Sequence, residues 1–274
     1  MADNKRSKKW SILSKIVIGL TLFFFYLPIV YIIIFSFNSS ASLTSLDGFS
    51  LRWYEKVFRS SDMMGSIWYT ILCAVIATVV STVFGTFTAI GLSRTGKHLR
   101  HSVERINELP VMNPDIVTAI GLLMLFSALT VTKGFATMVI AHIMFCTPYV
   151  ILTVMPKLMK LDPNLTDAAL DLGCNPFQAM TKVIIPQIKP NIIAGALIAF
   201  TMSFDDFVIS YFVTGNGVNN ISIQVYTMTK RINPSINALS TLVILIITVS
   251  LLTLNIVPMI KNRAQKRAQS KALK

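Results

Sequence analysis

The segment KLMKLDPNLTDAALDLGCNPFQAMTKVIIPQIKP, residues 157–190, is a long polar interval between two apolar runs. Within it, Asp162-Pro163 predicts a helix start, because Asp caps free backbone N–H groups and Pro fits the first helical position. We expect this helix over residues 163–172, with Gly173 as its left-handed C-terminal cap. Asn175-Pro176 predicts a second helix, so the segment is expected to present two short helices joined at a glycine.

Two interpretations of this segment are open at this point. Most polar segments between apolar runs are solvated connectors that carry no function of their own. Two short helices joined at a glycine and presented outside a membrane also suit the docking of a partner protein. Pro186 and Pro190 mark the approach to the next apolar run.

The composition indicates a membrane protein. With 53 % hydrophobic and 14 % charged residues, the chain is too apolar for an ordinary soluble domain. Residues 16–46, 63–93 and 232–260 carry no charged side chain, and each run is longer than the roughly 20 residues that a helix needs to cross a bilayer. The first run is also longer than the roughly 7–15 apolar residues of a signal peptide, so we expect it to be a retained span.

We expect an all-α polytopic protein with six transmembrane helices. The helices would form one domain over residues 16–260, which is preceded by a basic N-terminus (residues 1–15) and followed by a basic tail (residues 261–274). The net charge of +13 does not indicate a nucleic-acid partner, because the basic residues gather at both termini and in residues 94–105, beside span ends. By the positive-inside rule, we expect both termini and that loop to lie in the cytoplasm. The spans themselves are expected to contact membrane lipid. The expected spans are residues 16–37, 67–92, 109–129, 135–155, 192–213 and 236–260.

Four acidic residues lie within or beside the expected spans, namely Glu108, Asp115, Asp205 and Asp206. A carboxylate at mid-bilayer costs roughly 2.5–3.5 kcal/mol on insertion scales, so it normally faces a bundle interior or a wet cavity. With no Lys or Arg well inside any span, these acids predict a path for a cationic substrate.

Other roles for the four acids stay open. Protonation, pairing with a partner subunit and capping of a broken helix are alternatives, and Asp115 after Pro114 suits the last of these. Glu108 is also suited to the cytoplasmic interface. On a continuous helix, Asp205 and Asp206 would point about 100° apart, so we expect one to bind substrate while the other orients a neighbour.

Two further patterns do not predict chemistry in this chain. Residues 91–97 spell G-x-x-x-x-G-K, but His98 stands where a phosphate-binding loop has Ser or Thr for Mg²⁺, and no strand precedes it. We therefore expect no cofactor here, and any ATP, with its Mg²⁺, would be used by a partner chain. His142 and Cys146 lie one turn apart, but two ligands do not make a metal site, which favours packing or hydrogen bonding between helices.

Residues 167–186 resemble the "EAA" signature of ABC-importer permeases. Asp167-Ala168-Ala169 fall where that family has Glu-Ala-Ala, and Gly173 matches the signature glycine. Val183, Ile185 and Pro186 fall where the family has Ile-x-Leu-Pro. The resemblance implies that this segment is a cytoplasmic coupling helix, which lies in a groove of the ATPase.

Other runs resemble the second permease subunit of spermidine/putrescine ABC importers, the PotC type, over nearly the whole chain. The resemblance implies a MetI-like bundle in a bacterial cell membrane, transporting polyamines. It also implies four kinds of partner: a second permease (PotB-like), two ATP-binding subunits (PotA-like), an extracytoplasmic polyamine-binding protein (PotD-like) and lipid. The runs are residues 112–117 (MNPDIV), 142–146 (HIMFC), 203–206 (SFDD), 212–215 (FVTG) and 237–239 (NAL).

In such a transporter the implied mechanism is alternating access. The binding protein would dock on external residues 49–61 and 215–233, and ATP-driven closure of the ATPase would pull on residues 163–173. Three alternatives remain: an ABC permease for another small solute such as an amino acid or an inorganic ion, a solitary channel, and an intramembrane aspartyl protease using Asp115 and Asp205. The protease is disfavoured because the chain lacks its Gly-x-Gly-Asp pattern.

Overall fold

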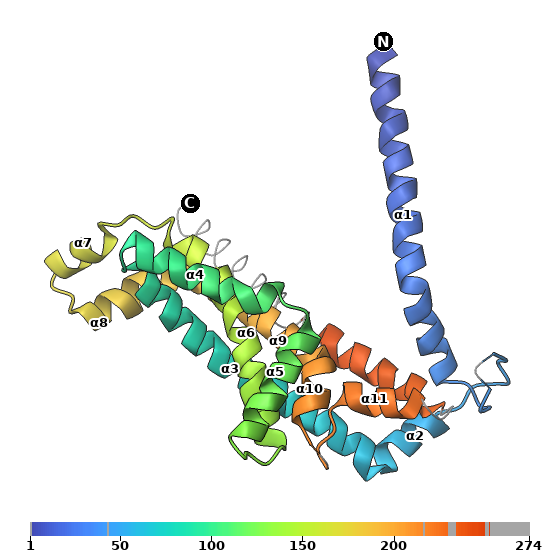
Figure 1. Ribbon diagram of the computed structural model, residues 1–274. Helices are drawn as coiled ribbons and strands as arrows, with labels where there is room; N and C mark the ends of the chain where they lie inside the picture. Colours follow the sequence, from blue (N-terminus) through green and yellow to red (C-terminus); the bar gives the residue numbers. More distant parts are fainter. Residues whose placement is uncertain (1, 43, 216, 230–233, 250–251, 253–274) are drawn as a thin grey trace. The chain divides into compact units, whose positions relative to one another are not determined.

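The computed structural model describes residues 2–42, 44–215, 217–229, 234–249 and 252, and this part of the chain is helical, with one isolated bridge between Asn38 and Phe49 (Figure 1). The chain divides into two compact units, each described by itself below. The first comprises Met1–Met64 and Val225–Val249, and the second comprises Gly65–Gln224 and Ser250–Lys274.

The first unit contains α1 (Ala2–Ser36), α2 (Arg52–Arg59) and the apolar helix Ser235–Val249. The second contains most of α3 (Ser61–Ser93), and α11 (Ile221–Thr229) passes from the second unit into the first. The remaining helices of the second unit are α4 (Lys97–Met112), α5 (Asp115–Ala128), α6 (Phe135–Leu158), α7 (Leu165–Asp171), α8 (Pro176–Gln178), the π-helical segment η1 (Ala179–Ile184), α9 (Ile185–Asp205) and α10 (Val208–Val213).

Four helices in the described residues are long and apolar enough to cross a membrane, or five if the bent pair α4–α5 is one span. The four are Ser14–Ser36, Ser61–Ser93, Phe135–Leu158 and Pro176–Asp205. The multi-pass architecture is therefore confirmed, while the count of six stays a prediction. Residues 250–251 and 253–260 of the sixth expected span, and the tail 261–274, lie outside the described residues.

Helix α6 is the central helix of the second unit, and α9 packs along it. Val150 of α6 lies between glycines of two neighbouring helices. A Cβ added at Gly85 of α3 would lie 2.8 Å from Val150 Cβ, and one at Gly195 of α9 would lie 3.4 Å from Val150 Cα. Small residues at these positions let the three helices approach closely, which is how helices associate where lipid supplies no hydrophobic drive.

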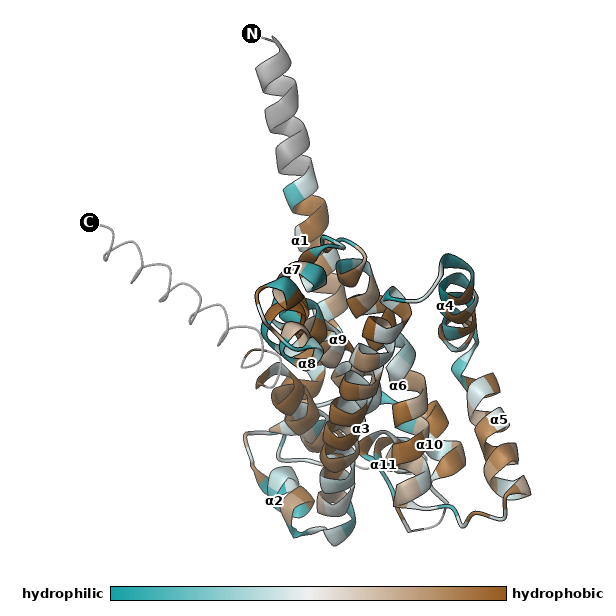
Figure 2. Ribbon diagram, turned by 90° about the vertical axis from the view of Figure 1, so that its left-hand side faces the viewer, coloured by the Kyte–Doolittle hydropathy of each residue, from teal (hydrophilic) through white to brown (hydrophobic). Residues whose placement is uncertain are grey.

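The expected third span, residues 109–129, is not one straight helix. The chain breaks at Asn113-Pro114, and α4 and α5 meet at 102°. Pro disfavours the helical conformation of the residue before it, and Asn113 is extended with ψ 142°. Residues 109–112 therefore belong to α4, which Figure 2 shows as largely hydrophilic, whereas α5 is largely hydrophobic.

The expected fifth span, residues 192–213, has different limits in the structure. Helix runs without interruption from Pro176 to Asp205, through both Pro186 and Pro190, and α10 is a separate helix. The π-helical segment η1 ends just before Pro186. A proline ring clashes with the carbonyl four residues earlier, and a widened π turn gives that carbonyl room.

Residues 214–233, expected as an external loop, contain a helix of their own, α11. Its first turn is fixed by Asn220, whose Oδ1 accepts the backbone N–H of Ile223 at 2.9 Å. The hydroxyl of Thr70 on α3 accepts the N–H of Ile221 at 2.8 Å, which ties the start of α11 to a membrane helix.

Candidate functional site

The helix break between α9 and α10 is organised by Asp206. Helix α9 ends at Asp205, and Asp206 is extended, with φ −61° and ψ 126°. Its carboxylate accepts the backbone N–H groups of Ile209 at 3.3 Å and Ser210 at 2.7 Å, which are free donors of the first turn of α10. The expectation that Asp205 and Asp206 lie on one continuous helix, about 100° apart, is therefore wrong, because the helix ends between them.

His142 of α6 contacts both sides of this break. Its Nδ1 lies 2.7 Å from Ser203 Oγ on α9, and its Nε2 lies 2.9 Å from Ser210 Oγ on α10 and 3.4 Å from Asp206 Oδ2. The predicted hydrogen bonding of His142 between helices is confirmed. Cys146, one turn on, packs with Sγ 3.4 Å from the carbonyl oxygen of Ala199.

Asn220 completes the cluster from the segment before α11. Its side-chain amide donates to the backbone carbonyl of Asp206 at 2.8 Å and to Ser210 Oγ at 2.9 Å. The side chains of His142, Ser203, Ser210 and Asn220 are all almost completely buried. The sequence reasoning missed Ser210 and Asn220. Ser210, an isolated polar residue four positions after Asp206 in an apolar stretch, was a usable signal, whereas Asn220 lies among other polar residues and gave none.

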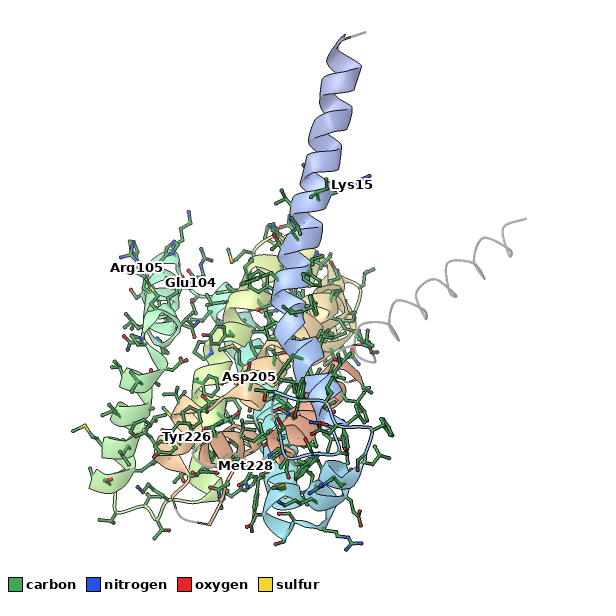
Figure 3. All side chains as sticks on the ribbon, turned by 90° about the vertical axis from the view of Figure 1, so that its right-hand side faces the viewer. Lys15, Glu104, Arg105, Asp205, Tyr226 and Met228 are labelled. Carbon is green, nitrogen blue, oxygen red and sulfur yellow. The ribbon has the colours of Figure 1, made fainter. Side chains whose placement is uncertain are left out.

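The two adjacent acids occupy different environments. The side chain of Asp206 is 8 % exposed, whereas Asp205, the last residue of α9, is an exposed residue. Figure 3 labels Asp205 on the ribbon. The backbone carbonyl of Asp205 accepts a hydrogen bond from Ser222 Oγ at 3.3 Å, so its backbone is held while its side chain is accessible. Of the pair, Asp205 is the more exposed residue.

Glu108 and Asp115 lie on the bent pair α4–α5. Glu108 is exposed on the polar helix α4, and Asp115 is exposed in the first turn of α5. An acidic side chain at a helix N-terminus is stabilised by the helix dipole, so the position of Asp115 fits the helix-capping alternative. The two residues add negative charge to these helices without entering the buried cluster around His142.

The polar segment after α6 forms two helices joined at a glycine, as the sequence predicts. The first helix, α7, begins at Leu165 and not at Pro163, because Asp162 makes a turn first: its Oδ1 accepts the N–H of Asn164 at 2.9 Å and its carbonyl that of Leu165 at 3.1 Å. Asn175 then caps α8, with its side chain accepting the N–H of Gln178 at 2.8 Å and Pro176 in the first helical position.

The left-handed cap of α7 at Gly173 is confirmed, with φ +82°. The N–H of Cys174 donates to the carbonyl of Ala169 at 3.1 Å, and the N–H of Gly173 donates to that of Leu170 at 2.9 Å. This is the paired hydrogen bonding that satisfies the free carbonyls at a helix C-terminus. It turns the chain sharply between the two short helices.

The surface of this segment combines signature residues with exposed apolar side chains. Asp167 and Ala168 are exposed while Ala169 is buried against the protein. Leu172 is 86 % exposed and Phe177 is 68 % exposed, so the segment presents two large apolar side chains beside its polar residues.

A cavity of about 380 Å³ separates α7 from the ends of α3 and α6. Arg94, at the end of α3, reaches Thr166 Oγ1 of α7 at 3.5 Å. The cavity is lined by Ile90, Ser93, Arg94, Leu158, Met159, Leu161, Asp162, Pro163, Thr166 and Ile184.

Curated relatives are similar over most of the chain. The chain is 35 % identical over 237 residues to the putrescine transport system permease protein PotI of Escherichia coli, covering 84 % of each sequence. It is 34 % identical over 224 residues to the spermidine/putrescine transport system permease protein PotC of the same organism, covering 81 % of this chain and 85 % of that protein. PotC of Haemophilus influenzae is 33 % identical over 224 residues, 81 % of this chain and 87 % of that one.

Solved structures show the same fold at low sequence identity. A bacterial ABC transporter that imports the acidic polysaccharide alginate matches with a TM-score of 0.71 at 18 % identity, over 93 % of this chain and 96 % of that one. The methionine ABC transporter MetNI, in an inward-facing conformation, matches with a TM-score of 0.59 at 17 % identity, over 72 % of this chain and 97 % of that one.

Residues 81–270 match the family described as binding-protein-dependent transport system inner membrane component. This match spans α6, both short helices of the polar segment and the α9/α10 break. The resemblance to ABC-importer permeases is thereby confirmed, as is the expectation that the chain is a transport subunit and not an enzyme. The chain belongs to the binding-protein-dependent transport permease family.

Proposed function

We propose that this chain is the transmembrane permease subunit of an ATP-driven ABC importer for polyamines. The observation that carries the proposal is the exposed carboxylate of Asp205 at the break of an apolar span, in a chain similar to permeases of putrescine and spermidine/putrescine systems. Polyamines are chains of ammonium groups, so a carboxylate on the path supplies the counter-charge that they need.

The broken helix adds to the attraction for a cation. The C-terminal end of a helix carries a partial negative charge, and transporters use such half-helix ends beside their substrate sites. Asp205 is the last residue of α9, so its carboxylate and the helix end lie together. Asp115 and Glu108 are proposed as further acidic residues of the path, and Asp206 as the residue that supports the break.

The segment around α7 is proposed as the contact with the ATPase. Its exposed Asp167 and Ala168 and the exposed Leu172 and Phe177 form the surface that a partner groove would cover. Three further signature residues support this segment: Ala169 is buried, Gly173 makes the left-handed turn, and Pro186 lies in the first turn of α9. ATP and Mg²⁺ are used by that partner, whose closure would move α7 and re-orient the spans.

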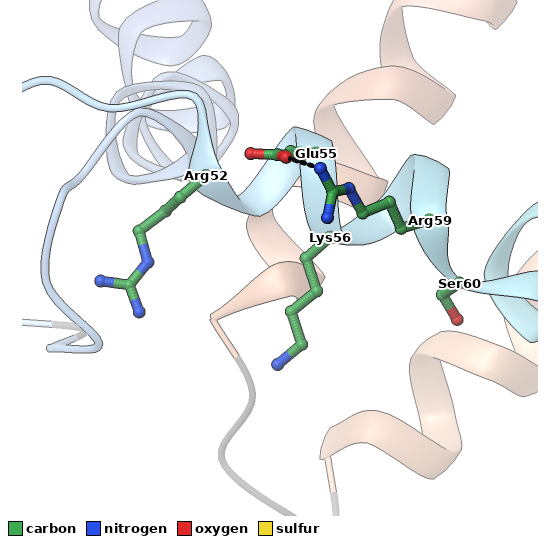
Figure 4. A pocket seen from close by; sticks show the side chains of 5 residues that line it. All are labelled: Arg52, Glu55, Lys56, Arg59 and Ser60. Atoms are coloured by element: carbon green, nitrogen blue, oxygen red, sulfur yellow. Dashed lines mark ion pairs between the residues drawn. The ribbon is translucent and has the colours of Figure 1, made fainter.

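Helix α2 is proposed as part of the docking surface for the extracytoplasmic binding protein. Its side chains line a cavity of about 460 Å³, and Arg59 pairs with Glu55 at 2.6 Å. Figure 4 shows these side chains and the ion pair. Arg52 and Lys56 lie over the ring of Trp53 and leave this face net positive. Such a face would attract acidic residues of a partner protein and repel a free polyamine.

The complete transporter would contain four kinds of subunit. This chain would form half of the path, with a PotB-like second permease forming the other half. Two PotA-like subunits would hydrolyse ATP, and a PotD-like protein would deliver the polyamine. Both termini of this chain are proposed to lie in the cytoplasm.

Uptake of radiolabelled spermidine and putrescine tests the substrate. The assay uses a strain without its own polyamine uptake that carries the full transporter, with this subunit intact or as Asp205→Asn. Loss of a substrate-facing charge is expected to lower uptake about tenfold, the effect of roughly 1.4 kcal/mol. Asp62→Asn, which removes an exposed carboxylate outside the membrane-spanning break, is the matched control and should transport normally.

Two outcomes would contradict parts of the proposal. Normal uptake by the Asp205→Asn transporter would remove Asp205 from the path. Absence of polyamine uptake with the intact subunit, in an assembled complex, would reject the polyamine substrate and favour another small solute such as an amino acid or an inorganic ion.

A further inference from the structure

We propose that His142 is a positioning residue of the translocation path, which joins α9 to α10 across their break and thereby fixes where Asp205 presents its carboxylate. The proposal rests on the proposed function, because it assigns a role to the site at which the substrate is expected to bind. It goes beyond that function by assigning the geometry of the site to a buried side chain that touches no substrate.

The first support is the position of the imidazole relative to the break. Ser203 lies on α9, before the break, and Ser210 lies on α10, after it. Each ring nitrogen of His142 contacts one of these two hydroxyls, at 2.7 Å and 2.9 Å. Since His142 belongs to α6, a third helix, one side chain sets the orientation of both half-helices against the central helix of the unit.

The second support is the burial of the cluster. His142 is 1 % exposed, and the ring of Phe145 lies edge-on with its centroid 5.2 Å away. In a cluster buried from water, loss of one partner leaves the others with unsatisfied donors or acceptors, which is costly because water cannot replace the lost hydrogen bond. The polar groups therefore hold one arrangement, and a change in His142 is transmitted to its partners.

The third support is that Asp205 and Asp206 have different surroundings. The carboxylate of Asp206 accepts two backbone N–H groups and faces His142 Nε2 at 3.4 Å. An ionised carboxylate only accepts hydrogen bonds, so this contact calls for a proton on Nε2 of His142. Asp206 is thus engaged within the protein, and the adjacent Asp205 is the carboxylate offered at the break.

The two ring nitrogens define a matched pair of variants. The amide of Gln reaches about as far along the side chain as Nε2, and the amide of Asn about as far as Nδ1. His142→Gln can therefore keep a donor toward Ser210 and Asp206 on the far side of the break. It loses only the contact to Ser203, whose hydroxyl can donate instead to a backbone carbonyl one turn earlier in its own helix. His142→Asn keeps the contact to Ser203 on α9 but does not reach α10.

The experiment measures spermidine and putrescine uptake by the complete transporter with each variant, in wild-type and Asp205→Asn backgrounds. Co-purification of the ATPase and second permease with this chain reports assembly. We expect His142→Gln to transport within about threefold of wild type and His142→Asn to lose about tenfold, the effect of one unsatisfied buried group. In the Asp205→Asn background, His142→Asn should add no further loss, because the carboxylate that it positions is already gone.

Three results would overturn the proposal. The first is equal uptake by the His142→Asn and His142→Gln variants. The second is a full additional loss of uptake when His142→Asn is combined with Asp205→Asn, because a general structural role of His142 would produce that loss. If the histidine variants do not assemble, Ser210→Ala, which removes one hydroxyl at the α10 end, replaces them, and normal uptake by it would be the third. Failure of the intact transporter to take up polyamines would instead reject the proposed function.

Discussion

At the scale of the residue, neighbouring acids of identical chemistry have separate roles because their backbones differ. Asp205 ends α9 with its side chain exposed, while Asp206 turns back to accept the N–H groups of Ile209 and Ser210. A carboxylate in a capping position satisfies donors that the helix itself cannot. The first therefore suits binding, and the second stabilises the break.

The capping role of Asp206 predicts how its variants affect stability. Asp206→Ala removes both accepting oxygens and should lower the free energy of unfolding by about 1–2 kcal/mol, the usual cost of losing a cap. Asp206→Asn keeps one accepting oxygen and should cost less. Thermal unfolding of the purified, detergent-solubilised transporter measures both, and equal stability of the Ala variant and wild type would contradict the capping role.

At the scale of the element, helix limits depend on how each proline is accommodated. Pro114 ends α4 and bends the chain by 102°, as steric exclusion predicts for the preceding residue. Pro186 and Pro190 instead lie within one continuous helical segment, because the π-helical turn before Pro186 relieves the clash. Proline thus ends the helix α4 but is accommodated within the continuous helical segment that includes α9.

The close approach of α3 to α6 predicts a strong effect of a single methyl group. Gly85→Ala would place a Cβ 2.8 Å from Val150 Cβ, so we expect a loss of about 1–3 kcal/mol of unfolding free energy from overpacking. Gly91→Ala on the same helix is the matched control, since no atom lies within 4 Å of its added Cβ. Val150→Ala removes Cγ1, which also lies 2.8 Å from the added Cβ, and should restore part of the Gly85→Ala loss in thermal unfolding. An unaffected Gly85→Ala protein would show that these helices do not pack as described.

At the scale of the whole molecule, the chain is a multi-pass membrane protein of the binding-protein-dependent permease family. The basic residues at the termini and at residues 94–105 are expected to face the cytoplasm by the positive-inside rule, and on that ground we propose that α2 is external.

The sidedness can be checked with two matched cysteine substitutions. Ser61→Cys, next to α2, should react with a membrane-impermeant thiol reagent in intact cells, provided the reagent can cross the outer envelope. Ser102→Cys on α4 should react only after the cells are permeabilised. The background carries Cys174→Ser, because the other two cysteines are buried. Labelling of Ser102→Cys in intact cells would reverse the proposed topology.

The sequence by itself determined the membrane class, the helix–glycine–helix segment with its cap at Gly173 and its second helix start at Asn175-Pro176, and the acids of interest. These follow from signals that act within a few residues, such as apolar length, capping and the left-handed conformation of glycine. Only the tertiary structure decided that Asp206 is buried and Asp205 exposed, and that His142 meets Ser203 and Ser210. Those contacts join residues 61 and 68 positions apart, and a partner at that distance is selected by helix packing, which no local pattern encodes.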